Sequence, residues 1–407
     1  MPEATNKDCQ SARPYRLETK VQNYPWGSSG ANAFIPRLLD FEPEPGQTYA
    51  EMWMGVHPNG PSSIIDLEKG PMDLNTWLSE NPKQRLAVDP TQLTSNGLPF
   101  LLKVLSAAEA LSIQAHPNKA QAQELHKTDP DHYPDDNHKP EVAIALDHLD
   151  ALVGFISDEQ LTQLLEKTPE LDEMLQDHGP GSVDIYGAIK TIFQLWESQP
   201  ASISETSDQI YARISQTDKQ DETEALFMEQ YAKHGSDDIG LIFLFFLNRV
   251  HLEAGEAIFL APGVPHAYLK GNIIECMANS DNVVRLGLTN KFCDAEALKN
   301  ILVYDGGKDY RVSRSREGTL TDYKLPVTEF KIRALNLDDG EAQSFTSRRC
   351  LTMFLLIEGE VCIRWGGESQ SCSCIIKRGN AFITPANLAD FKVIARDDSK
   401  LYLVELS

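Results

Sequence analysis

The stretch Gly255-Glu-Ala-Ile-Phe-Leu-Ala-Pro-Gly-Val-Pro-His266 joins a short apolar run to a turn that two prolines stiffen. Further short stretches on either side, residues 250–256 and 272–278, are also predicted strands. Short strands separated by glycine and proline turns are typical of a β-sandwich or β-barrel. The sequence therefore predicts a β domain of this kind, with His266 directly after a stiff turn.

This stretch recurs near the end of the chain. Gly379-Asn-Ala-Phe-Ile-Thr-Pro-Ala-Asn-Leu-Ala-Asp390 aligns with it without a gap, and Asp390 stands where the first copy has His266. Recurrence of one such unit predicts two related barrels. Because the second copy lacks the histidine, we expect the C-terminal barrel to be structural.

The remaining strands and helices are predicted from the spacing of apolar residues. Alternation at Tyr15–Gln22 and Glu51–Pro58 predicts half-buried strands. From Ser157 to about Ile239 the spacing becomes three or four residues, and Ser157-Asp-Glu-Gln160 has the form of a helical capping box. We predict a mainly β fold in three parts: a first β domain of residues 1–154 and 240–320 that includes His266, a helical insertion of 155–239, and a C-terminal β domain of 321–407.

Composition limits the classes of partner. The chain has 407 residues, 41% of them hydrophobic, which is enough for a large core. A net charge of -23 disfavours nucleic-acid and membrane-surface binding, because both need a basic surface. A small phosphorylated ligand remains possible, since charges beyond about 8 Å are largely screened. The longest apolar run is too short to span a bilayer and the N-terminus has no signal-type stretch, so we expect a cytoplasmic location.

The stretch Leu111-Ser-Ile-Gln-Ala-His-Pro-Asn-Lys119 carries the first candidate metal ligands. Side chains two residues apart on a strand point to the same side, so Gln114 and His116 share a face. Glu141 and His266 offer a carboxylate and a second imidazole. Such a mixed nitrogen and oxygen set suits a divalent ion of the zinc type. Our hypothesis is that these four residues bind one metal ion.

Residues Asn279–Lys291 form the other dense polar stretch, with Asp281 and Arg285 four residues apart. They form either a surface loop with a salt bridge or a wall of the cavity that holds the metal ion. In the second case Arg285 would face a developing oxyanion, and Lys103 and Lys139 would gather a phosphate. Lys103 lies in an apolar run, where a lone buried ammonium is costly, so it must reach solvent or face a polar cavity.

Together, these motifs resemble those of the type I phosphomannose isomerase family, zinc enzymes of the cupin superfamily. The resemblance covers nearly the whole chain and is carried by Asn23–Gly27, Glu51–Pro58, Leu111–Lys119, His138–Glu141, Pro265–Tyr268 and Asn279–Lys291. It implies that residues 1–154 and 240–320 form a cupin-type β-barrel or jelly-roll catalytic domain that carries the metal site. By the same resemblance, 155–239 is a helical domain and 321–407 is a degenerate second cupin-like β domain without metal ligands. It also implies one zinc ion per chain on Gln114, His116, Glu141 and His266, the same four residues that strand spacing and ligand chemistry indicate.

The resemblance further implies an activity. The family interconverts mannose 6-phosphate and fructose 6-phosphate through a cis-enediol(ate), which supplies mannose for GDP-mannose synthesis and glycosylation. We therefore expect a small sugar-phosphate substrate, no nucleic-acid or membrane partner, and a monomer, with an oligomer left open. The implied catalytic residues are Arg285, His138, Asp281, Lys139 and Glu275, and the implied substrate-binding residues are Ser112, Lys103, Tyr268 and Lys291. The general base is left open among His138, Asp281 and Glu275.

Two other readings of the ligand set remain. Two histidines and one carboxylate are also the facial triad of non-haem iron oxygenases, although Gln114 as a fourth ligand leaves fewer open positions. A non-catalytic sugar-binding cupin would bind the sugar phosphate without turnover. A further histidine, His57, precedes a proline, and its expected role is structural.

Overall fold

The computed structural model describes residues 12–87, 97–176, 184–346, 350–367, 371–388 and 390–406. These residues fall into two compact units, each built from segments that are distant in the sequence. The first unit takes its residues from 1–106, 274–279 and 312–407, and the second consists of 107–273 and 280–311. The three predicted domains stay a proposal, because this division follows other boundaries and includes the helical segment in the second unit.

The first unit contains two open antiparallel sheets that share a core. The nine-stranded sheet has the order β15 (Arg314–Glu317), β16 (Leu320–Tyr323), β17 (Lys331–Leu337), β24 (Ser399–Glu405), β19 (Thr352–Glu358), β22 (Ala381–Thr384), β1 (Tyr15–Glu18), β6 (Ser63–Ile64) and β7 (Met72–Asp73). The four-stranded sheet has the order β18 (Ala342–Phe345), β23 (Phe391–Ala395), β20 (Glu360–Trp365) and β21 (Cys372–Lys377). Phe354 and Leu403 of one sheet pack in the same cluster as Ile363 and Val393 of the other. The arrangement is a sandwich rather than a closed barrel.

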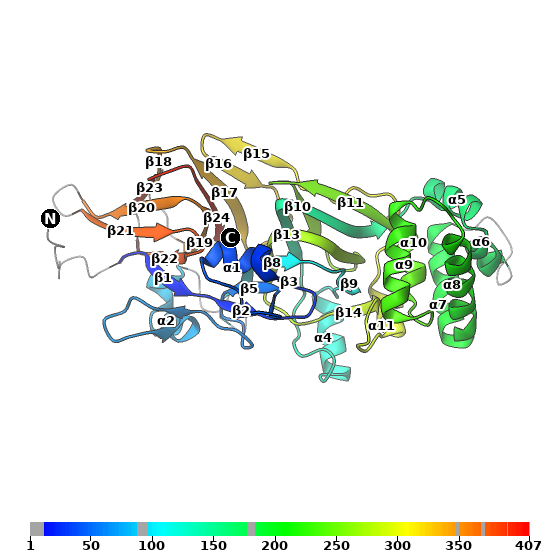
Figure 1. Ribbon diagram of the computed structural model, residues 1–407. Helices are drawn as coiled ribbons and strands as arrows, with labels where there is room; N and C mark the ends of the chain where they lie inside the picture. The colour runs from blue at the N-terminus through cyan, green and yellow to red at the C-terminus, as the bar shows by residue number, and fades with distance from the viewer. Residues whose placement is uncertain are drawn as a thin grey trace. The chain divides into compact units, whose positions relative to one another are not determined.

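The N-terminal strands of this unit differ in one respect from the prediction. The alternating stretch 15–22 forms two strands, β1 and β2 (Lys20–Gln22), which belong to different sheets. β1 pairs with β22 near the other end of the chain, and Figure 1 shows the two strands together. β2 pairs with β5 (Glu51–Met54), which pairs in turn with the fully buried β8 (Phe100–Ala107). The described part of this unit also contains the short elements β3 (Ser28–Ser29), β4 (Thr48–Tyr49), the 3-10 turn η1 (Gly30–Asn32), α1 (Phe34–Leu39), α2 (Leu74–Glu80) and α3 (Pro82–Arg85).

The strands of the second unit bring distant segments into register. The long strand β10 (Glu141–Phe155) pairs with both β11 (Leu247–Glu253) and β12 (Ala257–Leu260). The short strand β9 (Ile113–Ala115) lies between β13 (His266–Ala278) and β14 (Val284–Gly287). From Ile274 onward, β13 belongs to the first unit. The helices α4 (Lys119–Thr128) and α11 (Ala295–Ile301) also belong to the second unit.

The predicted helical segment is confirmed. It contains α5 (Asp158–Lys167), α6 (Pro169–Gln176), α7 (Ile185–Ser198), α8 (Pro200–Ser215) and α9 (Glu222–His234), followed by the buried α10 (Gly240–Phe246). Figure 1 shows these helices gathered in green. The capping box at Ser157 is present, with reciprocal bonds to Gln160. Phe193 and Phe227 of this segment are fully buried in the core, whereas Tyr186 is 52% exposed. None of the helices in the described ranges is long and apolar enough to cross a membrane.

The internal repeat is visible in the local structure. Gly255 and Gly379 both have φ +80°, a conformation that glycine adopts without steric cost. In each copy a four-residue strand begins two residues later, β12 in the second unit and β22 in the first. The next strand begins at His266 in one copy and directly after Asp390 in the other.

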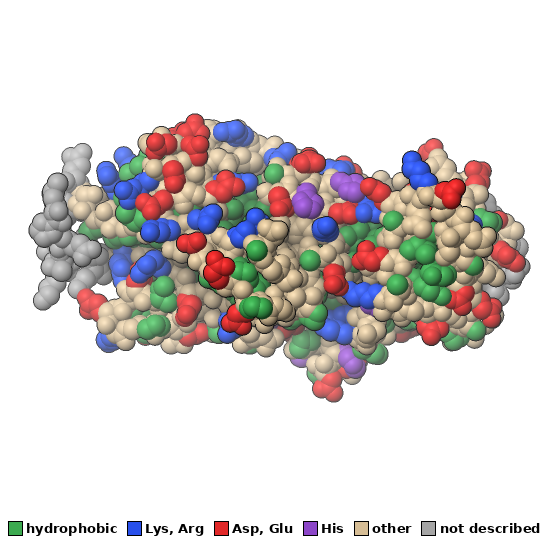
Figure 2. Space-filling view, in the orientation of Figure 1, with side chains coloured by type: hydrophobic (Ala, Val, Ile, Leu, Met, Phe, Trp, Pro, Cys, Tyr) green, Lys and Arg blue, Asp and Glu red, His purple; other side chains and the backbone are tan. Residues whose placement is uncertain are grey.

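Acidic side chains lie across the face drawn in Figure 2, in keeping with the net charge of -23.

Candidate metal centre

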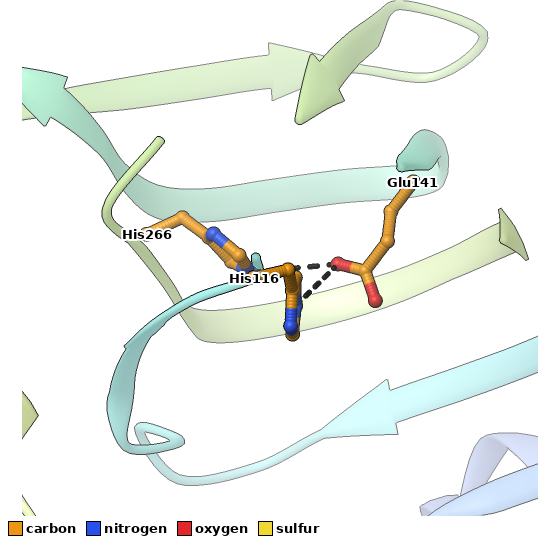
Figure 3. A group of neighbouring side chains, drawn as sticks. All are labelled: His116, Glu141 and His266. Atoms are coloured by element: carbon orange, nitrogen blue, oxygen red, sulfur yellow. Dashed lines mark ion pairs between the residues drawn. The ribbon is translucent and has the colours of Figure 1, made fainter. Parts of the chain in front are cut away.

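The second unit brings two imidazoles and one carboxylate together from the ends of three strands. His116 follows β9, Glu141 begins β10 and His266 begins β13. One ligand atom from each lies within 4.8 Å of the others, and no other such group of histidine, cysteine or acidic residues occurs in the part of the chain that the structure describes. Figure 3 shows the three side chains turned toward one another. All three are at most 2% exposed, so the group is rigidly held inside the fold.

Hydrogen bonds set the tautomer of both imidazoles. Nδ1 of His116 lies 2.8 Å from the Asn282 carbonyl oxygen, and Nδ1 of His266 lies 2.9 Å from that of Val264. A carbonyl only accepts, so each Nδ1 carries the hydrogen and each Nε2 keeps a free lone pair. This arrangement is usual for histidines that bind a metal through Nε2.

The free atoms converge on one point. Each Nε2 lies 3.4 Å from the same oxygen, Oε2 of Glu141. These two nitrogens and this oxygen are buried, and none of them has a hydrogen-bond partner among the described residues. Unsatisfied buried polar atoms are costly unless something binds them. Two neutral imidazoles and one carboxylate are the ligand types of zinc and similar divalent ions, so this donor set fits such a metal.

The charges of the group also suit a metal. Burial lowers the pKa of His116 to about 4, so this imidazole is neutral at pH 7. Burial alone would raise the pKa of Glu141, but Lys139 and the two imidazoles lower it well below its ordinary value. The Lys139 ammonium lies 3.2 Å from Oε1 of Glu141, on the oxygen that does not face the histidines. A metal needs a neutral imidazole and an ionised carboxylate, and the fold provides both.

Metal-free protein is expected to lose stability as the pH falls from 6.5 toward 4. Between these values the unfolded chain protonates His116, whose ordinary pKa is 6.5, whereas the folded chain keeps it neutral down to about 4. The unfolded state then binds more protons, so the free energy of unfolding decreases with falling pH by at most about 1.4 kcal/mol per pH unit from this group. Urea titrations across this range measure the slope. His116→Gln should flatten it, and an equally steep slope in that variant would contradict the assignment.

Strand pairing places Gln114 beside the same group. In β9, Gln114 lies opposite His266 of β13 on one side and opposite Arg285 of β14 on the other. Directly opposite residues of antiparallel strands point to the same face of the sheet. Gln114, His266 and Arg285 therefore share a face, and Gln114 is half-buried there. As a fourth metal ligand, Gln114 remains a proposal.

Two of the predicted cations of this unit, Arg285 and Lys291, have no carboxylate partner among the residues that the structure describes. Arg285 is half-buried, and no ion pair or side-chain hydrogen bond among the described residues includes it. Burial lowers its pKa, with Cys293 and Tyr133 as its polar neighbours. Lys291 is exposed in the loop after β14 and has no ion pair among the described residues. Both are therefore available to an anionic ligand.

Lys103 and Glu275 belong to the first unit, and there Lys103 is not the lone ammonium that the sequence suggested. Its Nζ lies 3.2 Å from Oε2 of Glu275 and 3.3 Å from Oε2 of Glu51, and all three side chains are buried. The ring of Trp53 lies 5.2 Å from the same ammonium. Sequence reasoning missed Glu51, and the available signal was a carboxylate in an otherwise apolar strand.

The other predicted residues occupy varied positions. Tyr268 is buried on β13 with its ring 6.1 Å from that of His266. Ser112 and His138 are half-buried, and Asp281 is exposed. His57 of the first unit accepts from the Asn59 N–H and packs against Trp53, in agreement with a structural role. Sequence reasoning also missed Asn282, whose carbonyl orients His116.

Comparison with known proteins gives the family. A family profile described as phosphomannose isomerase type I, catalytic domain, matches residues 15–157. Mannose-6-phosphate isomerase 1 of Arabidopsis thaliana is 35% identical over 98% of this chain and 95% of its own length. The chain belongs to the type I phosphomannose isomerase family. The mannose-6-phosphate isomerase of Pan troglodytes is 39% identical over 79% of this chain and 81% of its own length.

Solved structures of phosphomannose isomerases agree with this assignment. A single-residue variant of the Salmonella typhimurium phosphomannose isomerase is 28% identical, with a TM-score of 0.82 over 97% of this chain and 99% of that one. A mannose 6-phosphate isomerase bound with zinc and yttrium is 27% identical, with a TM-score of 0.82 over 97% and 99% of the two chains. The predicted mainly β, cupin-type fold with helices and the resemblance to type I phosphomannose isomerases are confirmed.

Proposed function

We propose that this protein is a zinc-dependent aldose–ketose isomerase that interconverts mannose 6-phosphate and fructose 6-phosphate. The observation that carries the proposal is the convergence of His116, Glu141 and His266 on one buried point, with their free atoms otherwise unsatisfied. Membership of the phosphomannose isomerase family supports the substrate pair. A family structure that holds zinc supports the choice of metal. A cytoplasmic, monomeric state is part of the same proposal.

The centre would hold the metal through His116, Glu141 and His266, with Gln114 as the proposed fourth ligand. The ion would supply Lewis-acid polarisation of the sugar oxygens, which is worth several kcal/mol of barrier. Arg285 lies on the same sheet face as Gln114 and His266 and carries an uncompensated charge, so we assign to it the stabilisation of the enediolate. The proton between the two carbons would be moved by His138, Asp281 or Glu275, and the choice among them stays open.

Phosphate binding is proposed for several cations and hydroxyls of the chain. Lys139 is paired with Glu141, and Lys103 is paired with two carboxylates, so both would bring little net charge to a phosphate. Their assignment as phosphate ligands, together with that of Ser112 and Tyr268, remains a proposal. Lys291 has no ion pair among the described residues and lies in the loop after β14. We propose that it contributes more than the other lysines to attracting the phosphate group.

Removal of the metal is expected to abolish turnover. Mannose 6-phosphate isomerisation is measured in a coupled assay before and after a chelator, and the rate should fall at least about 100-fold and return when zinc is added. Elemental analysis provides the control that the treated protein is metal-free. Full activity in metal-free protein would contradict the proposal. Substrate binding without turnover would indicate a sugar-binding protein, and oxygen consumption with bound iron would indicate an oxygenase.

A further inference from the structure

One carboxylate joins two loops of the second unit, residues 135–137 and 280–282. Oδ1 of Asp135 accepts from the Ser280 hydroxyl at 2.8 Å and from the Asn137 N–H at 2.9 Å. Its Oδ2 accepts from the Asp281 N–H at 2.7 Å. The Asn282 side-chain amide donates in return to the carbonyl oxygens of Asp135 at 2.7 Å and Asn137 at 2.9 Å. Four of these hydrogen bonds hold the two loops together, and two of the four have the charged carboxylate as acceptor.

This cross-link reaches the metal group at both ends. The backbone carbonyl of Asn282 accepts from Nδ1 of His116, and the Asn282 side chain is fully buried. The loop at Asp135 leads directly to Lys139 and Glu141. Asp135 thus ties the segment that carries one candidate ligand to the carbonyl that orients another. The cross-linked loop at 280–282 also precedes β14, which carries the proposed active-site arginine.

We propose that Asp135 and Asn282 are positioning residues that set the metal affinity of the centre. They act through the Asn282 carbonyl, which fixes the ring orientation and tautomer of His116. Partners that hold a metal-binding histidine in this way typically contribute 10–100-fold to metal affinity. This role rests on the metal site of the proposed function. Asp135 and Asn282 would support that site without binding the metal ion themselves.

The test is zinc binding to the full chain, measured by competition with a chromophoric chelator. We expect Asp135→Ala and Asn282→Ala each to raise the zinc dissociation constant by about 10–100-fold. Asp135→Asn keeps one acceptor oxygen, so its effect should be smaller. Because both residues act through one loop, the double variant should be little weaker than either single variant. Cobalt(II) loaded in place of zinc should give a visible spectrum that changes in Asp135→Ala, which a purely structural role would not cause.

Asp136→Asn is the matched control. Asp136 is the next residue, but it is exposed and its carboxylate pairs with Lys119 at 3.3 Å. The Asp136→Asn variant should therefore bind zinc as tightly as the parent. Zinc affinity within about twofold of the parent and an unchanged cobalt spectrum in Asp135→Ala would overturn the inference. If that variant does not fold, Asp135→Asn and Asn282→Ala decide by the same two measurements. Failure of the parent itself to bind zinc is a separate result, which overturns the metal site and this role with it.

Discussion

Replacing His266 with alanine is expected to remove the bound metal and to lower isomerase activity by at least about 10³-fold. The Nε2 of this imidazole is one of the converging atoms, and its Nδ1 is fixed by the Val264 carbonyl. The truncation would remove one candidate ligand and leave Glu141 buried beside a cavity. Elemental analysis of the purified variant measures metal content, and the coupled assay measures turnover at saturating mannose 6-phosphate.

His148→Ala is the matched control for this prediction. His148 belongs to the same unit, in β10, but its side chain is 57% exposed and lies beside Asp147. This variant should keep the metal content and activity of the parent. If His266→Ala retained one metal ion per chain with unchanged affinity, the candidate centre would not be the metal site. Circular dichroism of both variants distinguishes removal of the imidazole from unfolding of the protein.

Replacing Arg285 with alanine is expected to lower kcat by about 10²–10³-fold while the metal remains bound. The guanidinium shares a sheet face with Gln114 and His266 and has no carboxylate partner among the described residues. It can therefore stabilise charge that develops on the substrate without first breaking an ion pair. Arg285→Lys should recover only part of the loss, because an ammonium cannot make the same paired hydrogen bonds.

Arg311→Ala serves as the control, since Arg311 is exposed in the same unit and lies near Asp309. It should leave kcat and KM unchanged. A loss of metal from Arg285→Ala would instead give Arg285 a role in the metal site. An increase in KM at constant kcat would mean that Arg285 binds substrate and transition state equally, which is the signature of a phosphate ligand.

Local spacing was enough to predict much of this protein. The period of the apolar residues identified the helical segment, and the capping box at Ser157 was confirmed atom by atom. The gapless alignment of residues 255–266 with 379–390 predicted a repeated unit, and in the structure the two segments have the same glycine conformation and the same strand length. Strand alternation and ligand chemistry selected His116, Glu141 and His266, which the fold brings together. The helical period and the capping box depend on neighbours in the chain, so the sequence carries them directly, whereas residue type alone selected the ligand set.

Other features were decided only by the tertiary structure. The alternation at 15–22 could not show that β1 and β2 enter different sheets, and nothing near Lys103 predicted that Glu51 and Glu275 neutralise it. The carbonyl that orients His116 belongs to Asn282, 166 residues away. Every residue except proline offers the same N–H and C=O groups, so the sequence does not mark which carbonyl will meet an imidazole. The contact between the Asn282 carbonyl and the His116 imidazole is decided when β9 pairs between β13 and β14. Long-range strand register, rather than residue type, determines where a backbone atom lies.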